Sequence, residues 1–135
     1  MNIFDGNIPI KNINNVGLAG LTDELFCRYI STIYYENDKN ILIVTASLFE
    51  ANQLHDSLLN YQYNVLLFPM DDFLTSEAIA VSPDLMVNRL ETLNTLLNGE
   101  KQIIVTNLMG YLKYLPTPDV YKNSIFTVKI GEDYD

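Results

Sequence analysis

Cysteine, basic side chains and long apolar runs are all scarce in this sequence. Cys27 is the single cysteine among 135 residues, so the chain cannot form an internal disulfide or a zinc site built on several cysteines. Its place within a helical pattern favours a small buried residue. No apolar run approaches the roughly 18 residues that a membrane-spanning helix requires, and residues 1–5 lack the pattern of a signal peptide. We therefore expect a cytoplasmic chain that contacts no membrane.

Positive charge is also in short supply. Eight Lys and Arg residues stand against 17 Asp and Glu residues, which gives a formal net charge of −9. Binding to nucleic acid depends largely on basic side chains that neutralise phosphates, and an acidic surface repels the phosphate backbone. We therefore expect no direct nucleic-acid binding by this chain, and we interpret its acidity as a solubilising surface.

Apolar runs of strand length alternate with helical patterns along the chain, an order typical of α/β folds. Residues 41–45 form a continuous apolar run, which favours a parallel strand covered on both faces. The strands are expected at residues 14–19, 41–45, 64–68, 102–106 and, at a sheet edge, 124–130. These elements predict a three-layer α/β fold, with helices on both faces of a mostly parallel sheet.

Four helices are expected between these strands, with N-caps at Thr22, Ser47, Ser82 and Asn107. The first ends at residues 37–40 and the last at about residue 115. Ser47 and Glu50 have the spacing of a capping box, and Gly99 stands where a glycine commonly ends a helix. The residues expected to be buried on the second and third helices are Ala51, Leu54, Leu58, Leu59, Met86, Leu90, Leu93 and Leu97.

A glycine-containing loop at residues 17–24 lies where a phosphate-binding loop would precede the first helix. Such a loop has the pattern G-x-x-x-x-G-K-[ST]. Counting from Gly17 places Thr22 on the second glycine, Asp23 on the lysine and Glu24 on the magnesium-binding hydroxyl, with Gly20 between them. Two carboxylates at the helix start complement its dipole and repel a triphosphate.

The loop therefore predicts a P-loop NTPase or helicase-like fold with a degenerate Walker A motif. We expect no catalytic residue, no bound nucleotide or other cofactor and no metal on this chain. A plain strand-to-helix turn that never bound phosphate is the alternative interpretation, and it predicts the same lack of nucleotide binding.

Other polar residues favour structural roles. His55 is followed by Asp56 and lacks a nucleophile in any recognisable motif, so we expect a surface or half-buried side chain. Asp71 and Asp72 follow a strand, as the acids of a receiver-like phosphoacceptor site do, but a solvated loop explains them as well. Arg89 could pair with Asp84, Glu91 or a partner, and we expect a structural ion pair.

Several segments in order resemble one family, the bacterial transcription-repair coupling factors. The resemblance covers residues 12 to 135 and includes F-P, S-P-D, R-L-E-T-L and L-P motifs. The layout is also similar to the first domain of UvrB. The matching segments are residues 41–51, 67–72, 82–84, 89–94, 103–106 and 112–116, with Glu77 between the second and third.

The resemblance implies a fold and a function. UvrB has an intact Walker A loop at this place, whereas the N-terminal module of the coupling factors has a degenerate copy without ATPase activity. Residues 1–130 would then form a UvrB-like helicase-type domain, and residues 131–135 would begin a linker into a following domain that is absent from this chain. UvrA would bind that absent domain. RNA polymerase and DNA, with ATP and magnesium, would bind other absent domains.

We accordingly expect a non-catalytic module that supports UvrA recruitment and packs against other domains of its protein. Two alternatives remain open from the sequence. One is a divergent nucleotide-binding helicase half, and the other is a receiver-like signalling domain that uses Asp71 or Asp72.

Overall fold

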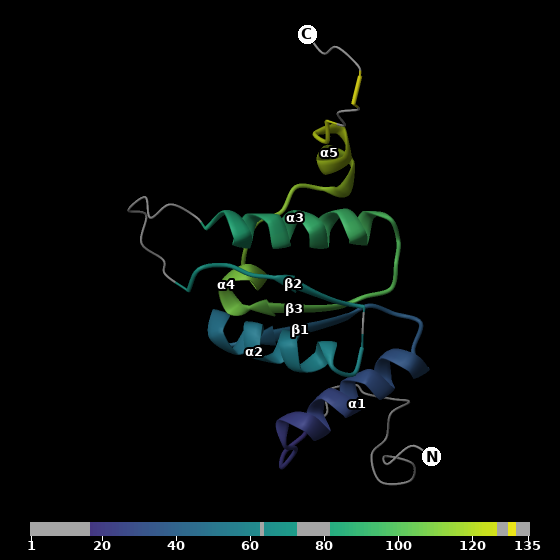
Figure 1. The fold of residues 1–135 in the computed structure, drawn as a ribbon, viewed down its shortest axis with the longest axis vertical. Helices are drawn as coiled ribbons and strands as arrows, with labels where there is room; N and C mark the ends of the chain where they lie inside the picture. Colours follow the sequence, from purple (N-terminus) through teal and green to yellow (C-terminus); the bar gives the residue numbers. More distant parts are fainter. Residues whose placement is uncertain (1–16, 63, 73–81, 127–129, 132–135) are drawn as a thin grey trace.

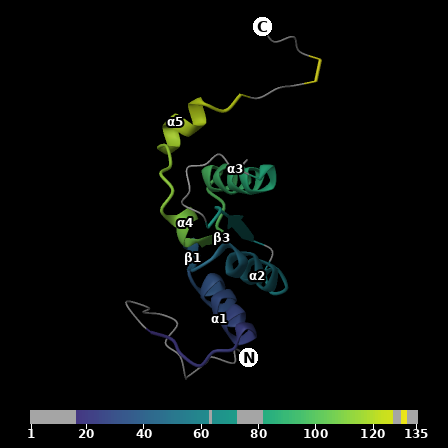
Figure 2. The same ribbon diagram turned by 90° about the vertical axis from the view of Figure 1, so that its left-hand side faces the viewer.

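Three parallel strands form a sheet that lies between two helical layers (Figure 1). The structure is a computed structural model, and it describes residues 17–62, 64–72, 82–126 and 130–131. Helices α1 and α2 lie on one side of the sheet and α3 on the other, and the view turned by 90° shows the same layers (Figure 2). The expected three-layer α/β fold with a parallel sheet is confirmed.

The strands are not arranged in the order of the sequence. β3 lies between β1 and β2, and both pairings are parallel, with Ile103 opposite Ile41 on one side and opposite Val65 on the other. The strands are β1 (Ile41–Thr45), β2 (Val65–Phe68) and β3 (Ile103–Asn107); the helices are α1 (Asp23–Glu36), α2 (Leu48–Leu59), α3 (Pro83–Leu97), α4 (Leu108–Tyr111) and α5 (Pro118–Asn123).

The residues that begin the helices explain their positions. The Thr22 side chain accepts a hydrogen bond from the backbone N–H of Leu25 at the start of α1, and Ser47 accepts one from Glu50 at the start of α2. Pro83 occupies the first turn of α3, where its missing N–H has no helical partner to lose. The expected caps at Thr22 and Ser47 are confirmed.

The hydrophobic core lies between the sheet and the layer formed by α1 and α2. Successive strand residues point to opposite faces, and the odd-numbered residues of the three strands point into this core. Ile103 and Val105 of β3 are fully buried there, against Cys27 of α1 and Leu58 of α2. Burial of such side chains supplies most of the stability of a small domain.

The opposite face of the sheet is only partly covered. Helix α3 packs on β2, and β1 at the far edge keeps Leu42 and Val44 exposed by 53% and 42%. The expectation that residues 41–45 are covered on both faces is therefore wrong for β1, because the helix that would cover its second face lies over the opposite edge.

The remaining sequence predictions are partly confirmed. The strands at residues 41–45, 64–68 and 102–106 are present to within a residue, and Gly99 follows α3 with φ of 75°. Residues 14–16 and 127–129 of the two terminal strands lie outside the described residues, while residues 17–19 and 124–126 are not strand. The segment before residue 124 instead forms α5, and α4 ends at Tyr111 rather than near residue 115.

Three of the residues predicted to be buried are exposed: Leu59, Met86 and Leu90. Ala51 and Leu58 are fully buried as expected, and Leu54, Leu93 and Leu97 are partly buried. The buried residue of α3 is Thr92, which lies on the side of the helix that packs on β2. Its burial is tolerated because its hydroxyl donates to the Leu67 carbonyl.

Candidate functional site at the carboxyl edge of the sheet

The loop at residues 17–24 lies at the start of α1, as the sequence predicts. Gly17, Gly20, Thr22, Asp23 and Glu24 are all exposed, and Gly20 has a φ of 80°. No other atom lies within 4 Å of a Cβ built at Gly17 or Gly20. The glycines therefore leave open space around the backbone, and the degenerate Walker A motif stays a prediction.

A cavity of about 560 Å³ lies between the starts of α1 and α2 and the carboxyl end of β1. In open α/β sheets, ligands bind outside the carboxyl ends of the strands. The charged side chains that line the cavity are two carboxylates, Asp23 and Glu50, so its electrostatics disfavour an anion. The other lining residues are Phe26, Ile43, Val44, Thr45, Ala46, Gln53, Leu54 and Ser57.

Glu50 helps to cap the start of α2. Its Oε2 accepts a hydrogen bond from the backbone N–H of Ala46 at 3.0 Å, while the Ser47 hydroxyl accepts one from the N–H of Glu50 at 3.2 Å. The two side chains thus form the expected capping box, shifted by one residue on the backbone side. The negative charge of Glu50 also complements the positive end of the helix dipole.

A second carboxylate, that of Asp72, accepts hydrogen bonds from the backbone at the start of α2. Both of its oxygens accept from the N–H of Leu48, at 3.0 and 2.9 Å, and the Nδ2 of Asn107 donates to Oδ1 at 2.7 Å. Asn107 also donates to the Met70 carbonyl at 2.7 Å and accepts from the N–H of Met70 at 3.1 Å. One carboxylate therefore joins the ends of all three strands.

This arrangement supports no anion chemistry at the α2 N-terminus. A helix N-terminus binds phosphate through free N–H groups and its dipole, but Asp72 takes the Leu48 N–H and Glu50 takes the Ala46 N–H. Within the described part of the chain, no group of three His, Cys, Asp or Glu side chains could hold a metal ion. No helix of the described residues is long and apolar enough to cross a membrane.

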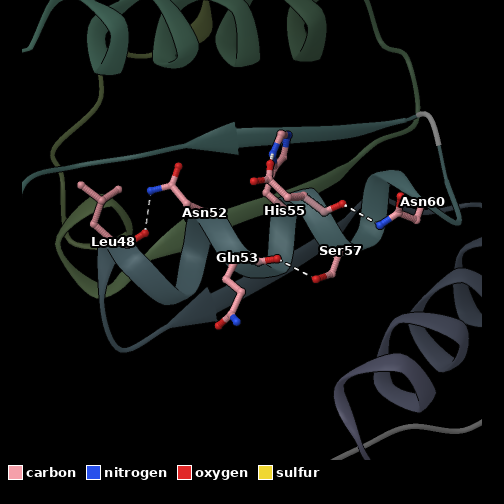
Figure 3. A network of polar contacts seen from close by, with 7 residues as sticks. Leu48, Asn52, Gln53, His55, Ser57 and Asn60 are labelled. Carbon is pink, nitrogen blue, oxygen red and sulfur yellow. Dashed lines mark hydrogen bonds and ion pairs between the residues drawn. The ribbon is translucent and has the colours of Figure 1, made fainter.

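The exposed face of α2 shows only local polar contacts (Figure 3). Asn52 donates to the Leu48 carbonyl, Ser57 to the Gln53 carbonyl and Asn60 to the Asp56 carbonyl, at 2.8, 2.8 and 3.3 Å. Each bond joins residues one helical turn apart, so these contacts are local to the helix and connect it to no other element.

His55 is half-buried, as expected. Its side chain is 20% exposed, and Nδ1 lies 3.2 Å from Oδ1 of Asp56. It lines a cavity of about 260 Å³ beside β2, together with Asn88 and Glu91 of α3. The hydroxyl among the residues that line this cavity is that of Thr92, and it donates to the Leu67 carbonyl rather than to His55.

Arg89 and Cys27 take structural positions. The Nη1 of Arg89 donates to the Pro69 carbonyl at 2.9 Å, so the predicted ion pair with a carboxylate is wrong among the described residues. Cys27 is fully buried as predicted, and its burial, with smaller contributions from Asp23 and Glu24, raises the pKa of its thiol. A raised pKa keeps this thiol protonated and unreactive.

Sequence reasoning placed Asp72 in a solvated loop and missed its role. Asn107 was expected to cap α4, and its Oδ1 does accept from the Gly110 N–H at 3.2 Å, but the same side chain also holds Met70 and Asp72. The sequence did contain one indication of this contact. Asp72 and Asn107 each lie after a predicted parallel strand, and such strand ends meet at one edge of the sheet.

The chain is similar to several curated bacterial proteins that are named transcription-repair-coupling factor. The chain is 32% identical over 123 residues to a transcription-repair-coupling factor of Staphylococcus epidermidis, 32% identical over 120 residues to that of Bacillus subtilis, and 30% identical over 123 residues to that of Staphylococcus haemolyticus. These matches cover 90%, 87% and 90% of the chain but 10% of each relative.

The chain thus spans about one tenth of the length of the curated relatives that it matches. No family profile matches the chain, and no solved structure matches it. Over most of its length, the chain is similar to the N-terminal region of the transcription-repair coupling factors, and the family resemblance predicted from its sequence is confirmed.

Proposed function

We propose that this chain is a non-catalytic packing module of a transcription-repair coupling protein. In that cytoplasmic protein, the module supports UvrA recruitment by a neighbouring domain and packs against other domains. RNA polymerase, DNA, ATP and magnesium bind elsewhere in the polypeptide. The names of the relatives and the small share of their length that the chain spans support this proposal.

The observation that carries the proposal is the open apolar surface around β1. We call it the β1 surface and define it by Leu42, Val44, Tyr111 and Leu115, which are 42–58% exposed. A cavity of about 270 Å³ adjoins it, lined mostly by apolar side chains that include Leu42, Ile104 and Leu96. Contiguous exposed apolar surface is typical of sites that contact another protein part.

The backbone of β1 is open as well. The N–H of Ile41 donates to the Gln102 carbonyl, and because successive strand residues alternate in direction, the backbone groups of Leu42 and Val44 point away from β3. Among the described residues, no strand lies on that side of β1. Such an edge can accept a further strand.

The other edge of the sheet is partly bonded by α3. At β2, the Thr92 hydroxyl donates to the Leu67 carbonyl at 2.9 Å, and Arg89 donates to the Pro69 carbonyl. These two α3 side chains bond carbonyls at the carboxyl end of β2, where a neighbouring strand would otherwise donate. The contrast between the edges favours β1 as the one that packs against the rest of the protein.

The negative charge around the cavity between the starts of α1 and α2 disfavours nucleotide binding. Asp23 and Glu50 line the cavity where a nucleotide would bind in an active relative of this fold, and Asp72 holds the first N–H of α2. Bringing a triphosphate to these carboxylates costs roughly 1 to 4 kcal/mol for each contacting charge pair. Hydrolysis of ATP is therefore assigned to other domains.

The proposal is tested by supplying this chain in trans to the remainder of the reading frame that encodes it and measuring their association by calorimetry. Val44→Lys places a charge at the open edge and should weaken association at least about tenfold, the effect of a lost apolar contact and a buried charge. Val87→Lys is the matched control, because Val87 is 60% exposed on α3. That variant should bind as the wild type does.

Three outcomes contradict the proposal. They are a reading frame that ends close to residue 135, a failure of the two parts to associate, and an equal loss of binding in both variants. A fluorescent ATP analogue with magnesium provides a separate test of the non-catalytic assignment. Saturable binding that Gly20→Asp abolishes would favour the divergent nucleotide-binding alternative.

A further inference from the structure

Two helices of this chain end on an asparagine with nearly the same backbone conformation. Asn60 ends α2 with φ −71° and ψ −17°, and Asn98 ends α3 with φ −74° and ψ −6°. Both residues are exposed. They differ in the residue that follows, which is Tyr61 after α2 and Gly99 after α3. Asn98–Gly99 is the one Asn–Gly pair in the sequence.

We propose that Asn98 is a site of spontaneous deamidation and that opening of the last turn of α3 controls its rate. The backbone nitrogen of Gly99 attacks Cγ of Asn98 and forms a new C–N bond. The Cγ–Nδ2 bond breaks, and ammonia leaves with the proton from the Gly99 amide. Water then opens the resulting succinimide, at one carbonyl or the other, to give aspartate or isoaspartate.

Glycine favours this reaction because it has no side chain to hinder the attacking nitrogen. The surroundings of Gly99 are open, since no other atom lies within 4 Å of a Cβ built at this position. Tyr61 places a bulky side chain beside the equivalent nitrogen after Asn60. The two helix ends therefore form a natural comparison in which the following residue is the main difference.

The folded structure slows the reaction without blocking it. The Gly99 N–H donates to the Leu96 carbonyl at 3.1 Å, and the N–H of Asn98 donates to the Asn94 and Thr95 carbonyls at 3.3 and 3.2 Å. Attack requires breaking the first of these bonds and rotating ψ of Asn98 away from its helical value. Helix ends open locally far more readily than the whole domain unfolds.

The product would destabilise this corner of the fold. A carboxylate at position 98 lies at the negative end of the α3 dipole, two residues before the exposed Glu100. Isoaspartate also adds one methylene to the backbone of the turn that leads to the central strand β3. A deamidated molecule should therefore unfold at a lower urea concentration than an intact one.

The test is incubation of the folded chain and the urea-unfolded chain at mildly alkaline pH, followed by peptide mapping by mass spectrometry with detection of isoaspartate. We expect product at Asn98 before any at Asn60 in both samples. The reaction in the folded sample should be slower by about tenfold or more, since it depends on opening of the helix end.

Asn98→Gln is the matched control, because glutamine keeps the amide but would have to close a larger ring, and it should abolish the product at this position. Product that appears first at another asparagine contradicts the assignment. Equal rates in the folded and unfolded samples contradict control by the helix end. An Asn98→Asp variant that is as stable to urea as the wild type contradicts the predicted effect of the new charge.

Discussion

Among the described glycines, Gly110 is the one at which an added Cβ would clash with neighbouring atoms. It is buried in α4, and a Cβ at this residue would lie 2.8 Å from the backbone carbonyl oxygen of Phe68 and in closer conflict with the Thr106 hydroxyl. Because one obstacle is backbone, a rotamer change cannot relieve the clash. The glycine thus lets α4 approach β2 and β3 closely.

Gly110→Ala should destabilise the chain by about 1–3 kcal/mol, the usual cost of forcing a methyl group into a packed site. Urea denaturation followed by circular dichroism measures the loss. Gly17→Ala is the control, because a Cβ at Gly17 meets no other atom within 4 Å and φ is not positive there. Equal stability of the Gly110 variant and the wild type would contradict this account of the close approach.

The burial of Cys27 makes the stability of the fold depend on pH. Burial raises the pKa of its thiol, and the carboxylates of Asp23 and Glu24 raise it further. An unfolded chain therefore loses the thiol proton at a lower pH than the folded chain does. The contribution of this group to stability is complete below the unfolded pKa, and it is lost as the pH rises through the folded value.

Alkylation by iodoacetamide should accordingly be slow for the folded chain at neutral and mildly alkaline pH and rapid in urea. The rate is measured by mass spectrometry across this pH range. A reference thiol is provided by Gly17→Cys in a Cys27→Ala background, because residue 17 is exposed. Labelling of Cys27 in the folded chain at the rate of that reference would show that the thiol is not protected.

At the scale of the element, α3 stabilises the β2 edge through side chains. Thr92 is 1% exposed, and its hydroxyl bonds the outward-facing carbonyl of Leu67, one helical turn from Arg89, which bonds Pro69. The helix therefore packs on the strand and also bonds carbonyls at its carboxyl end. Removal of either side chain leaves a carbonyl without its partner.

Thr92→Val keeps the shape of the side chain and removes the hydroxyl, so the Leu67 carbonyl loses its bond. The expected loss of stability is about 1–3 kcal/mol, the cost of leaving a buried polar group unsatisfied. Thermal unfolding monitored by circular dichroism tests this. Thr92→Ser restores the donor and should recover part of the loss, whereas equal losses in both variants would show that packing alone is responsible.

The helix caps were predictable because their interactions are local. Thr22 and Ser47 each bond an N–H three residues away, so the sequence itself contains both partners. The burial of Thr92 and the exposure of Met86 were not predictable. They depend on which edge of the sheet α3 covers, and residue spacing within one helix carries no information on that point.

At the scale of the whole molecule, the parallel α/β class followed from alternating elements, but the strand order did not. Three short apolar runs are compatible with several orders, and the observed β1-β3-β2 order depends on both crossovers together. For the same reason, Asp72 and Asn107 could be placed near one sheet edge but not in contact. The open β1 surface also follows from this order, because β1 is left at the edge.

The central position of β3 has a consequence for folding during synthesis. Within the described residues, both outer strands pair with β3 alone, and β3 is the last of the three to be made (Figure 1). Until the ribosome has made β3, β1 and β2 lack the strand with which both pair in the described part of the chain, although their helices can already form. The nascent chain must therefore keep two apolar strands from aggregating until residues 103–107 emerge and pair with both.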